Sequence, residues 1–113
     1  MRFDFTDKGI IDLAMRLIET WFLSVGLRPM DNFDPTDPAC VKDYGPHRIV
    51  TCSATVPPMS WFASAEMLQV AFARYLAAYN SAVEHPEARF GMYSLKFYPG
   101  THVRGTCYAS IYQ

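Results

Sequence analysis

The sequence predicts an α+β fold: an antiparallel sheet of at least three strands with two helices packed on one face, in the order helix, long loop, strand, helix, strand, strand. Two segments repeat apolar residues at the three- and four-residue spacing of a helix face. Three others alternate along the chain as half-buried strands do. A length of 113 residues lies in the range of one domain, so we expect residues 1–113 to form a single unit.

The first helix is expected over about residues 7–25. Thr6 can cap its amino end, Asp7 follows in the first turn, and Gly26 suits the left-handed conformation that often follows a last turn. Its apolar face consists of Ile10, Leu13, Ala14, Leu17, Ile18, Trp21, Phe22 and Val25. Most polar residues fall on the opposite side, so one face of this helix should be buried.

An irregular loop is expected at residues 27–46. Its first part, residues 28–38, holds three prolines and three aspartates, and both residue types favour turns over regular structure. A short edge strand inside this loop stays open as an alternative. Asp31, Asp34 and Asp37 are secondary candidates for contact with a basic partner. Their spacing of three, with no closing glutamate, does not fit a calcium loop, so we predict no metal site.

Residues 47–56 alternate between two faces as a strand, with Val50, Cys52 and Ala54 on one side. A second helix is expected over residues 61–83. Its N-cap would be Ser60 or Ser64, and its main face would be Leu68, Ala71, Phe72, Tyr75, Tyr79 and Val83. The rest of its circumference is also mostly apolar and includes Met67, Val70, Leu76, Ala77 and Ala78. A helix of this kind is normally covered on more than one side, so a homodimer through helix 61–83 is an alternative to consider.

The last two strands, residues 90–98 and 102–112, are expected to form a hairpin. A three-residue loop at 99–101 pairs Tyr98 with His102 and sets the apolar positions of the two strands opposite each other. The inward set is Tyr93, Leu95, Phe97, Val103, Cys107, Ala109 and Ile111. The same alternation puts Phe90 and Met92 on the outer face, with Met92 opposite Tyr108.

The predicted register also places Lys96 directly opposite Arg104 on the outer face. Like charges in opposed positions destabilise a sheet, so we interpret the pair as a contact surface for an acidic partner. The partner-binding candidates are Lys96, Tyr98, His102, Arg104 and Tyr108. The alternative is an ordinary solvated face, because tyrosine is a good strand former and long basic side chains can splay apart.

Composition excludes several classes of protein. A net charge of −1, from 10 basic and 11 acidic residues, argues against a general nucleic-acid binder. Arg16 and Glu19 interrupt the first apolar stretch, and the first residues lack the order of a signal peptide, so we expect no membrane contact. Three cysteines outside any CxxC pair favour reduced thiols and a cytoplasmic location.

No catalytic motif is recognisable, and we predict no catalytic residue and no cofactor. Cys52 and Cys107 fall on inward faces, while Cys40 lies seven residues before His47, a spacing of no recognised motif. We therefore expect a non-enzymatic protein-interaction module, such as a small stoichiometric inhibitor or adaptor. A phage or mobile-element protein directed at a host complex fits this profile. The alternative is a small enzyme that uses a Cys or His near the long loop.

Overall fold

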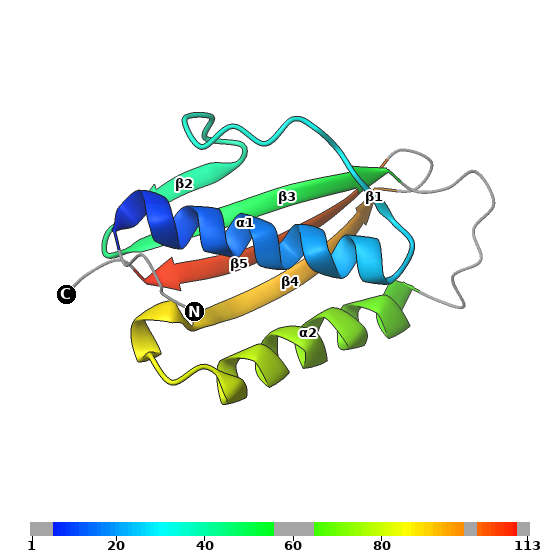
Figure 1. The fold of residues 1–113 in the computed structure, drawn as a ribbon. Helices are drawn as coiled ribbons and strands as arrows, with labels where there is room; N and C mark the ends of the chain where they lie inside the picture. The colour runs from blue at the N-terminus through cyan, green and yellow to red at the C-terminus, as the bar shows by residue number, and fades with distance from the viewer. Residues whose placement is uncertain (1–5, 56–64, 99–101, 111–113) are drawn as a thin grey trace.

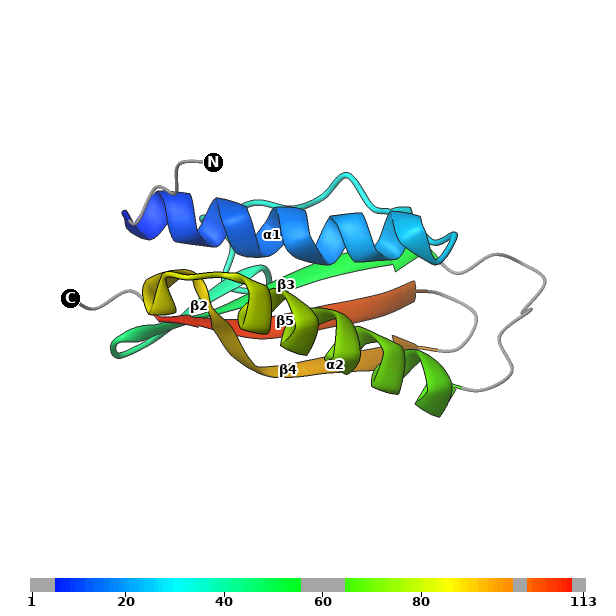
Figure 2. The same ribbon diagram turned by 60° about the horizontal axis from the view of Figure 1, so that its bottom comes forward.

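The computed structural model describes residues 6–55, 65–98 and 102–110, and it confirms the α+β fold (Figure 1). Within these ranges five antiparallel strands run in the order β1-β3-β5-β4, with β2 also paired to β3. Both helices lie on the same side of the sheet (Figure 2). The elements are α1 (Asp7–Ser24), β1 (Arg28–Pro29), β2 (Val41–Tyr44), β3 (His47–Thr55), α2 (Ala65–Ala82), a short 3-10 helix η1 (Pro86–Ala88), β4 (Phe90–Tyr98) and β5 (His102–Ser110).

Helix α1 begins and ends at the residues that its sequence indicates. The Thr6 side chain accepts a hydrogen bond from the Gly9 amide at 3.1 Å, which satisfies one of the free donors of the first turn. Gly26 has a φ of 82°, and the next amide, that of Leu27, donates to the Phe22 carbonyl at 2.8 Å. After this left-handed turn the chain continues with Leu27, which is buried in the core, and then enters β1.

The segment 27–46 is only partly irregular, because it contains β1 and β2. Both short strands pair with the same edge of β3: Arg28 lies opposite Thr55, and Tyr44 lies opposite His47. Gly45, with a φ of 64°, makes the tight turn between β2 and β3. The edge strand left open by the sequence is therefore present as two pieces, separated by the Pro- and Asp-rich turns.

The core lies between the sheet and the two helices. The inward positions of β3 and β5 are buried as predicted: Val50, Cys52, Ala54, Val103, Cys107 and Ala109. Gly105 occupies an inward position of β5 that side chains from both α1 and α2 reach. A Cβ there would lie 3.0 Å from Ile18 Cγ2 and 3.4 Å from the Cζ atoms of Phe22 and Phe72. Trp21 closes the gap between the helices with an edge-on contact to Phe72 at 5.0 Å between ring centroids.

Side chains of α2 also bond to part of the free edge of β4. The Asn80 side chain donates to the Phe90 carbonyl at 2.6 Å and accepts from the Phe90 amide at 3.0 Å, as a neighbouring strand would. Gln69 donates to the Leu95 carbonyl at 2.9 Å. Leu76, which the sequence pattern placed outside the main face of this helix, is fully buried. That assignment was therefore wrong: Leu76 belongs to the face of α2 that packs on the sheet.

The predicted assignment of residues to the two faces of β4 is wrong at the start of the strand, before Ser94. An extra residue between Gly91 and Ser94 forms a bulge, so Gly91 rather than Met92 lies opposite Tyr108. Phe90 consequently faces inward, is 2% exposed and stacks on Tyr79 at 5.9 Å. Burial of this ring and the double hydrogen bond from α2 outweigh simple alternation.

Beyond the bulge the predicted register is confirmed, with Lys96 opposite Arg104 and Tyr98 opposite His102. The remaining expectations fall outside the described residues. These are the loop at 99–101, the caps and start of the second helix at 60–64, and the inward position of Ile111.

Replacing Gly105 with valine is expected to lower the free energy of unfolding by about 1–3 kcal/mol, because stiff methyl groups would meet Ile18 and two phenylalanine rings. Gly91→Val is the matched control, since a Cβ at Gly91 has no neighbour within 4 Å. Urea unfolding followed by circular dichroism gives both values. Equal stability of the two variants would mean that the helices do not pack tightly on β5.

Candidate functional site

The face of the sheet opposite the helices, the outer face, carries basic, aromatic and hydroxyl side chains. Cross-strand partners share a face, so the register assigns its members. They are Arg28, Lys42, Tyr44, His47, Ile49, Thr51, Ser53, Thr55, Gly91, Ser94, Lys96, Tyr98, His102, Arg104, Thr106 and Tyr108. None of these described positions is an aspartate or glutamate. The outer face is therefore positive, although the whole chain has a formal net charge of −1.

Four of the five predicted partner-binding residues meet at one end of this face, which we call the basic end: Lys96, Tyr98, His102 and Arg104. The Tyr98 and His102 rings stack at 4.5 Å with an interplanar angle of 16°. Lys96 Nζ lies 5.5 Å from the Tyr98 ring centroid, and Arg104 Cζ lies 5.6 Å from it. The electron-rich face of the tyrosine offsets part of the repulsion between the two cations and fixes where they lie.

The two cations at the basic end have no carboxylate partner among the described residues. The ion pairs among the described residues lie elsewhere: they join Arg16 to Asp12, and Arg48 to Asp7 and Asp43. The Arg104 Nε atom is buried, and it has no hydrogen-bond partner within the described ranges. Positive charge that is positioned but not neutralised is the arrangement expected of a site for an anion.

Tyr108, the fifth candidate, lies apart from the other four. Its ring contacts Tyr44 edge-on at 6.4 Å and His47 at 6.0 Å, and we call these three residues the aromatic end. The sequence did not single out Tyr44 as a contact residue and considered His47 only for catalysis. The Gly45–Pro46 pair between them is a turn signal that could have revealed the β2–β3 hairpin and so this cluster.

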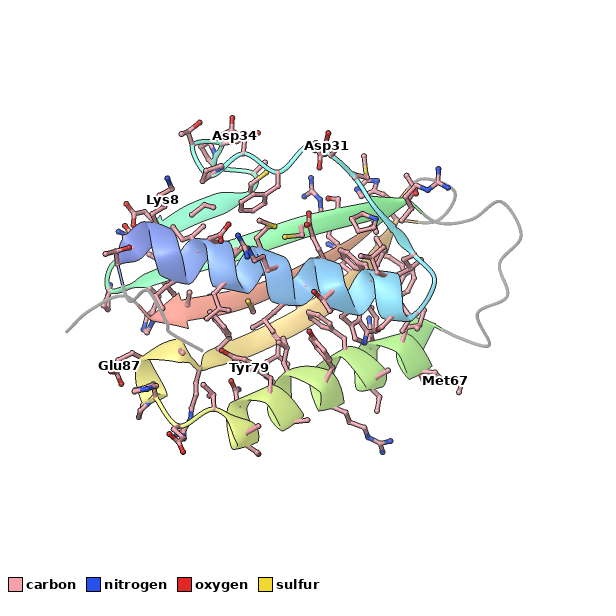
Figure 3. All side chains as sticks on the ribbon, in the orientation of Figure 1. Lys8, Asp31, Asp34, Met67, Tyr79 and Glu87 are labelled. Carbon is pink, nitrogen blue, oxygen red and sulfur yellow. The ribbon has the colours of Figure 1, made fainter. Side chains whose placement is uncertain are left out.

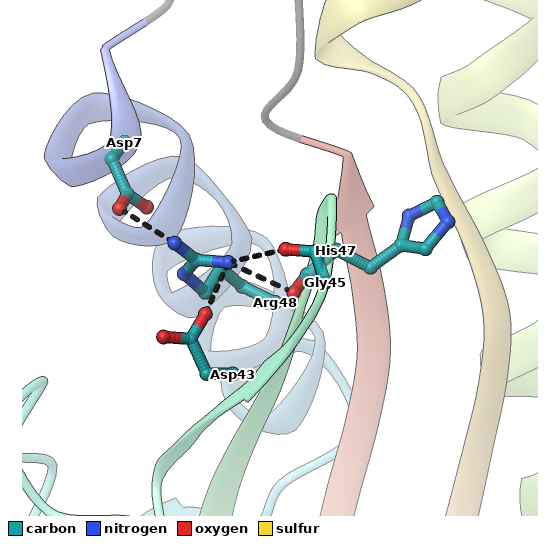
Figure 4. A network of polar contacts seen from close by, with 5 residues as sticks. All are labelled: Asp7, Asp43, Gly45, His47 and Arg48. Atoms are coloured by element: carbon teal, nitrogen blue, oxygen red, sulfur yellow. Dashed lines mark hydrogen bonds and ion pairs between the residues drawn. The ribbon is translucent and has the colours of Figure 1, made fainter.

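Arg48 holds the aromatic end against α1 (Figure 4). Its side chain is 17% exposed and reaches Asp7 at 3.3 Å as well as Asp43 of the neighbouring strand. The same guanidinium donates to the carbonyls of Gly45 and His47, each at 3.1 Å. One side chain thus ties the β2–β3 turn to the first turn of the helix, and the rings on the outer face are fixed from behind.

Two of the secondary candidates, Asp34 and Asp37, bond to residues of their own loop. Figure 3 labels Asp31 and Asp34 on this loop. Asp34 accepts hydrogen bonds from the amide and hydroxyl of Thr36, and these bonds lower the pKa of its carboxyl group. Asp37 accepts from the Ala39 amide at 2.9 Å. Asp31 is exposed, and its charge adds to the effect of burial that raises the pKa of Glu19. No three His, Cys, Asp or Glu side chains converge on a metal-sized space in the described ranges.

The candidates for catalysis are not brought together. Cys40 lies beyond the open end of the β2–β3 hairpin, where its carbonyl accepts from the Thr51 amide, whereas His47 lies at the closed end. Burial raises the pKa of the Cys52 and Cys107 thiols, which keeps both protonated. A pocket of about 440 Å³ beside α1 has neither Cys nor His in its lining, which is Asp7, Lys8, Ile11, Asp12, Met15, Phe33 and Pro35.

The free energy of unfolding is expected to fall as pH rises above about 9. An unfolded thiol ionises near its ordinary pKa of 9.0, whereas burial raises that of Cys107 to about 12, so alkali favours the unfolded chain across this window. Urea unfolding at pH 8 and pH 10.5 measures the loss. In a Cys52→Ala, Cys107→Ala variant the pH dependence should be shallower. The part due to Tyr75 and Tyr79, whose pKa values burial also raises, should remain. An unchanged slope would contradict the assignment to the thiols.

Neither described helix has both the length and the apolar character needed to cross a lipid bilayer. Comparison of the chain with protein-family models, curated proteins and solved structures finds no match. What the chain does is therefore inferred from its own side chains.

Proposed function

We propose that this chain is a non-enzymatic module that binds an acidic protein surface through the outer face of its sheet. The observation that carries the proposal is the basic end, where Lys96 and Arg104 flank the stacked rings of Tyr98 and His102 without a carboxylate partner among the described residues. Rigid rings offer contact area at low entropic cost, and fixed cations select a partner of opposite charge.

An acidic protein fits this face better than a nucleic acid does. The flat faces that could stack on bases are already engaged, since Tyr98 stacks on His102 and has both cations near its ring. The remainder of the molecule also carries the excess of aspartate and glutamate, which repels a long polyanion. A folded partner with a local acidic patch avoids both costs.

A small module that binds its partner through one face of its sheet can act as a stoichiometric inhibitor or an adaptor, and we propose that class of role. A protein carried by a phage or another mobile element and directed at a host complex would fit it. Three free cysteines suit a reducing compartment such as the cytoplasm. The separation of Cys40 from His47 gives the enzyme alternative no support.

We propose further that the exposed side of α2 pairs two copies of the chain. Met67 is 62% exposed and Val70 is 49% exposed, although both are large apolar residues. Ala77 and Ala78 are exposed on the same helix, and their small side chains would let two helices approach closely. A second copy would remove this apolar surface from water.

Reversing both charges of the basic end, with Lys96→Glu and Arg104→Glu, should weaken binding of the partner more than tenfold, or about 1.4 kcal/mol. The partner is first isolated on immobilised wild-type protein and identified by mass spectrometry, and its affinity is then measured by calorimetry. Binding by the wild type should also weaken as salt is added, because exposed charges are screened.

The matched control makes the same change of charge on helix α1, with Lys8→Glu and Arg16→Glu. Both residues are exposed and lie away from the outer face and from α2, and the ion pair of Arg16 with Asp12 is itself exposed. This variant should keep most of the affinity. If both double variants lose binding equally, net charge rather than the basic end determines affinity. If neither loses it, the interface lies elsewhere.

Light scattering after size-exclusion chromatography should give twice the 12.8 kDa of the chain at high micromolar concentration. Met67→Gln with Val70→Gln removes apolar surface at constant charge and should shift the protein to the monomer. A wild-type monomer under these conditions would refute pairing through α2.

A further inference from the structure

The outer face has two unlike ends on one strand. His102 belongs to the basic end and Tyr108 to the aromatic end, and both project from β5 on the same side of the sheet. Six residues at a rise of about 3.3 Å separate them by about 20 Å. A partner that fills the whole face must therefore satisfy two different environments at this spacing.

Short hydroxyl side chains occupy the space between the two ends. Thr51 and Thr106 lie opposite each other with their hydroxyl oxygens 3.0 Å apart, and Ser94 lies opposite Thr106 on the next strand. These groups provide donors and acceptors but little apolar surface. They suit the main chain of an extended segment, whose amides and carbonyls need partners, better than a helix, whose backbone groups bond to one another.

On the basis of the proposed function, we infer that the partner contributes an extended acidic segment laid along β5. Its carboxylates contact Lys96 and Arg104 at the basic end. About six residues away, an apolar or aromatic side chain packs among Tyr44, His47 and Tyr108. The orientation of the segment follows from the uneven charge of the two ends. Lys96 and Arg104 have no carboxylate partner among the described residues, and Arg28 lies in the same cross-strand row as His102. Near the three rings of the aromatic end, Lys42 is the single lysine or arginine among the described positions of the outer face.

The two ends should contribute differently to affinity. Contact of carboxylates with exposed cations weakens with salt, whereas packing of an apolar side chain against rings does not. Removing the basic end should therefore change the salt dependence of binding. Removing the aromatic end should weaken binding and leave its salt dependence unchanged.

The test uses synthetic peptides with a fluorescent label, so that anisotropy reports binding. The full peptide has three glutamates, five alternating serines and glycines, and then leucine and phenylalanine, which places the leucine six residues after the last glutamate. A control peptide of the same composition has leucine and phenylalanine directly beside the glutamates. The full peptide should bind at least tenfold more tightly than this control.

Variants of the protein separate the two ends. Tyr108→Ala should abolish the preference for the full peptide and leave the salt dependence, and Tyr108→Phe, which keeps the ring, should retain the preference. Lys96→Glu with Arg104→Glu should weaken both peptides, and added salt should no longer weaken their binding, because glutamates of the protein then face glutamates of the peptide. Circular dichroism checks that each variant is folded.

The outcomes distinguish this inference from the proposed function. If both peptides bind equally and both depend on the basic end, the aromatic end has no role; the inference is then wrong and the proposed function stands. If oligothymidine binds at the basic end and neither peptide binds, the partner is a nucleic acid and both proposals fail. If neither peptide binds at millimolar concentration and oligothymidine does not bind either, the extended-segment inference is refuted. The proposed function is then tested by the affinity of the isolated partner for the wild type and the charge-reversed variants.

Discussion

The packing of side chains from both helices onto β5 at Gly105 is the constraint on which the rest of the structure depends. Because this position has no side chain, Ile18 of α1 and the rings of Phe22 and Phe72 can rest on the same stretch of backbone. Both helices are thereby committed to one side of the sheet, and all the large buried side chains lie with them. The opposite side is left without a helix, so it can carry polar and aromatic groups that a core would exclude.

Strand alternation then sorts the charges of a nearly neutral chain onto different faces. Asp43 and Arg48 point toward the helix side, where Arg48 also meets Asp7, so this group has one cation for two carboxylates. The residues between and beside them, including Lys42 and Tyr44, point to the outer face. A net charge of −1 for the whole chain therefore conceals one face without acidic groups among its described positions. Composition alone could not have separated these two environments.

The sheet offers its face rather than its β4 edge for contact. Asn80 and Gln69 of α2 bond to the backbone of Phe90 and Leu95, so part of that edge is already paired by side chains. The bulge that brings Phe90 into the core also leaves Gly91 opposite Tyr108. Gly91 has no side chain to cover the Tyr108 ring, and this ring contacts Tyr44 and His47 on the other side.

The sequence by itself determined the helices, the three long strands and the pairing of Lys96 with Arg104, because apolar periodicity and parity across a tight turn are local properties. Only the tertiary structure decided which residues join the site from a distance. Tyr44 and His47 reach Tyr108 because β2 folds back on β3 and β3 lies beside β5, and neither pairing follows from local periodicity. The inward position of Phe90 was decided in the same way, since a bulge forms where long-range packing outweighs alternation.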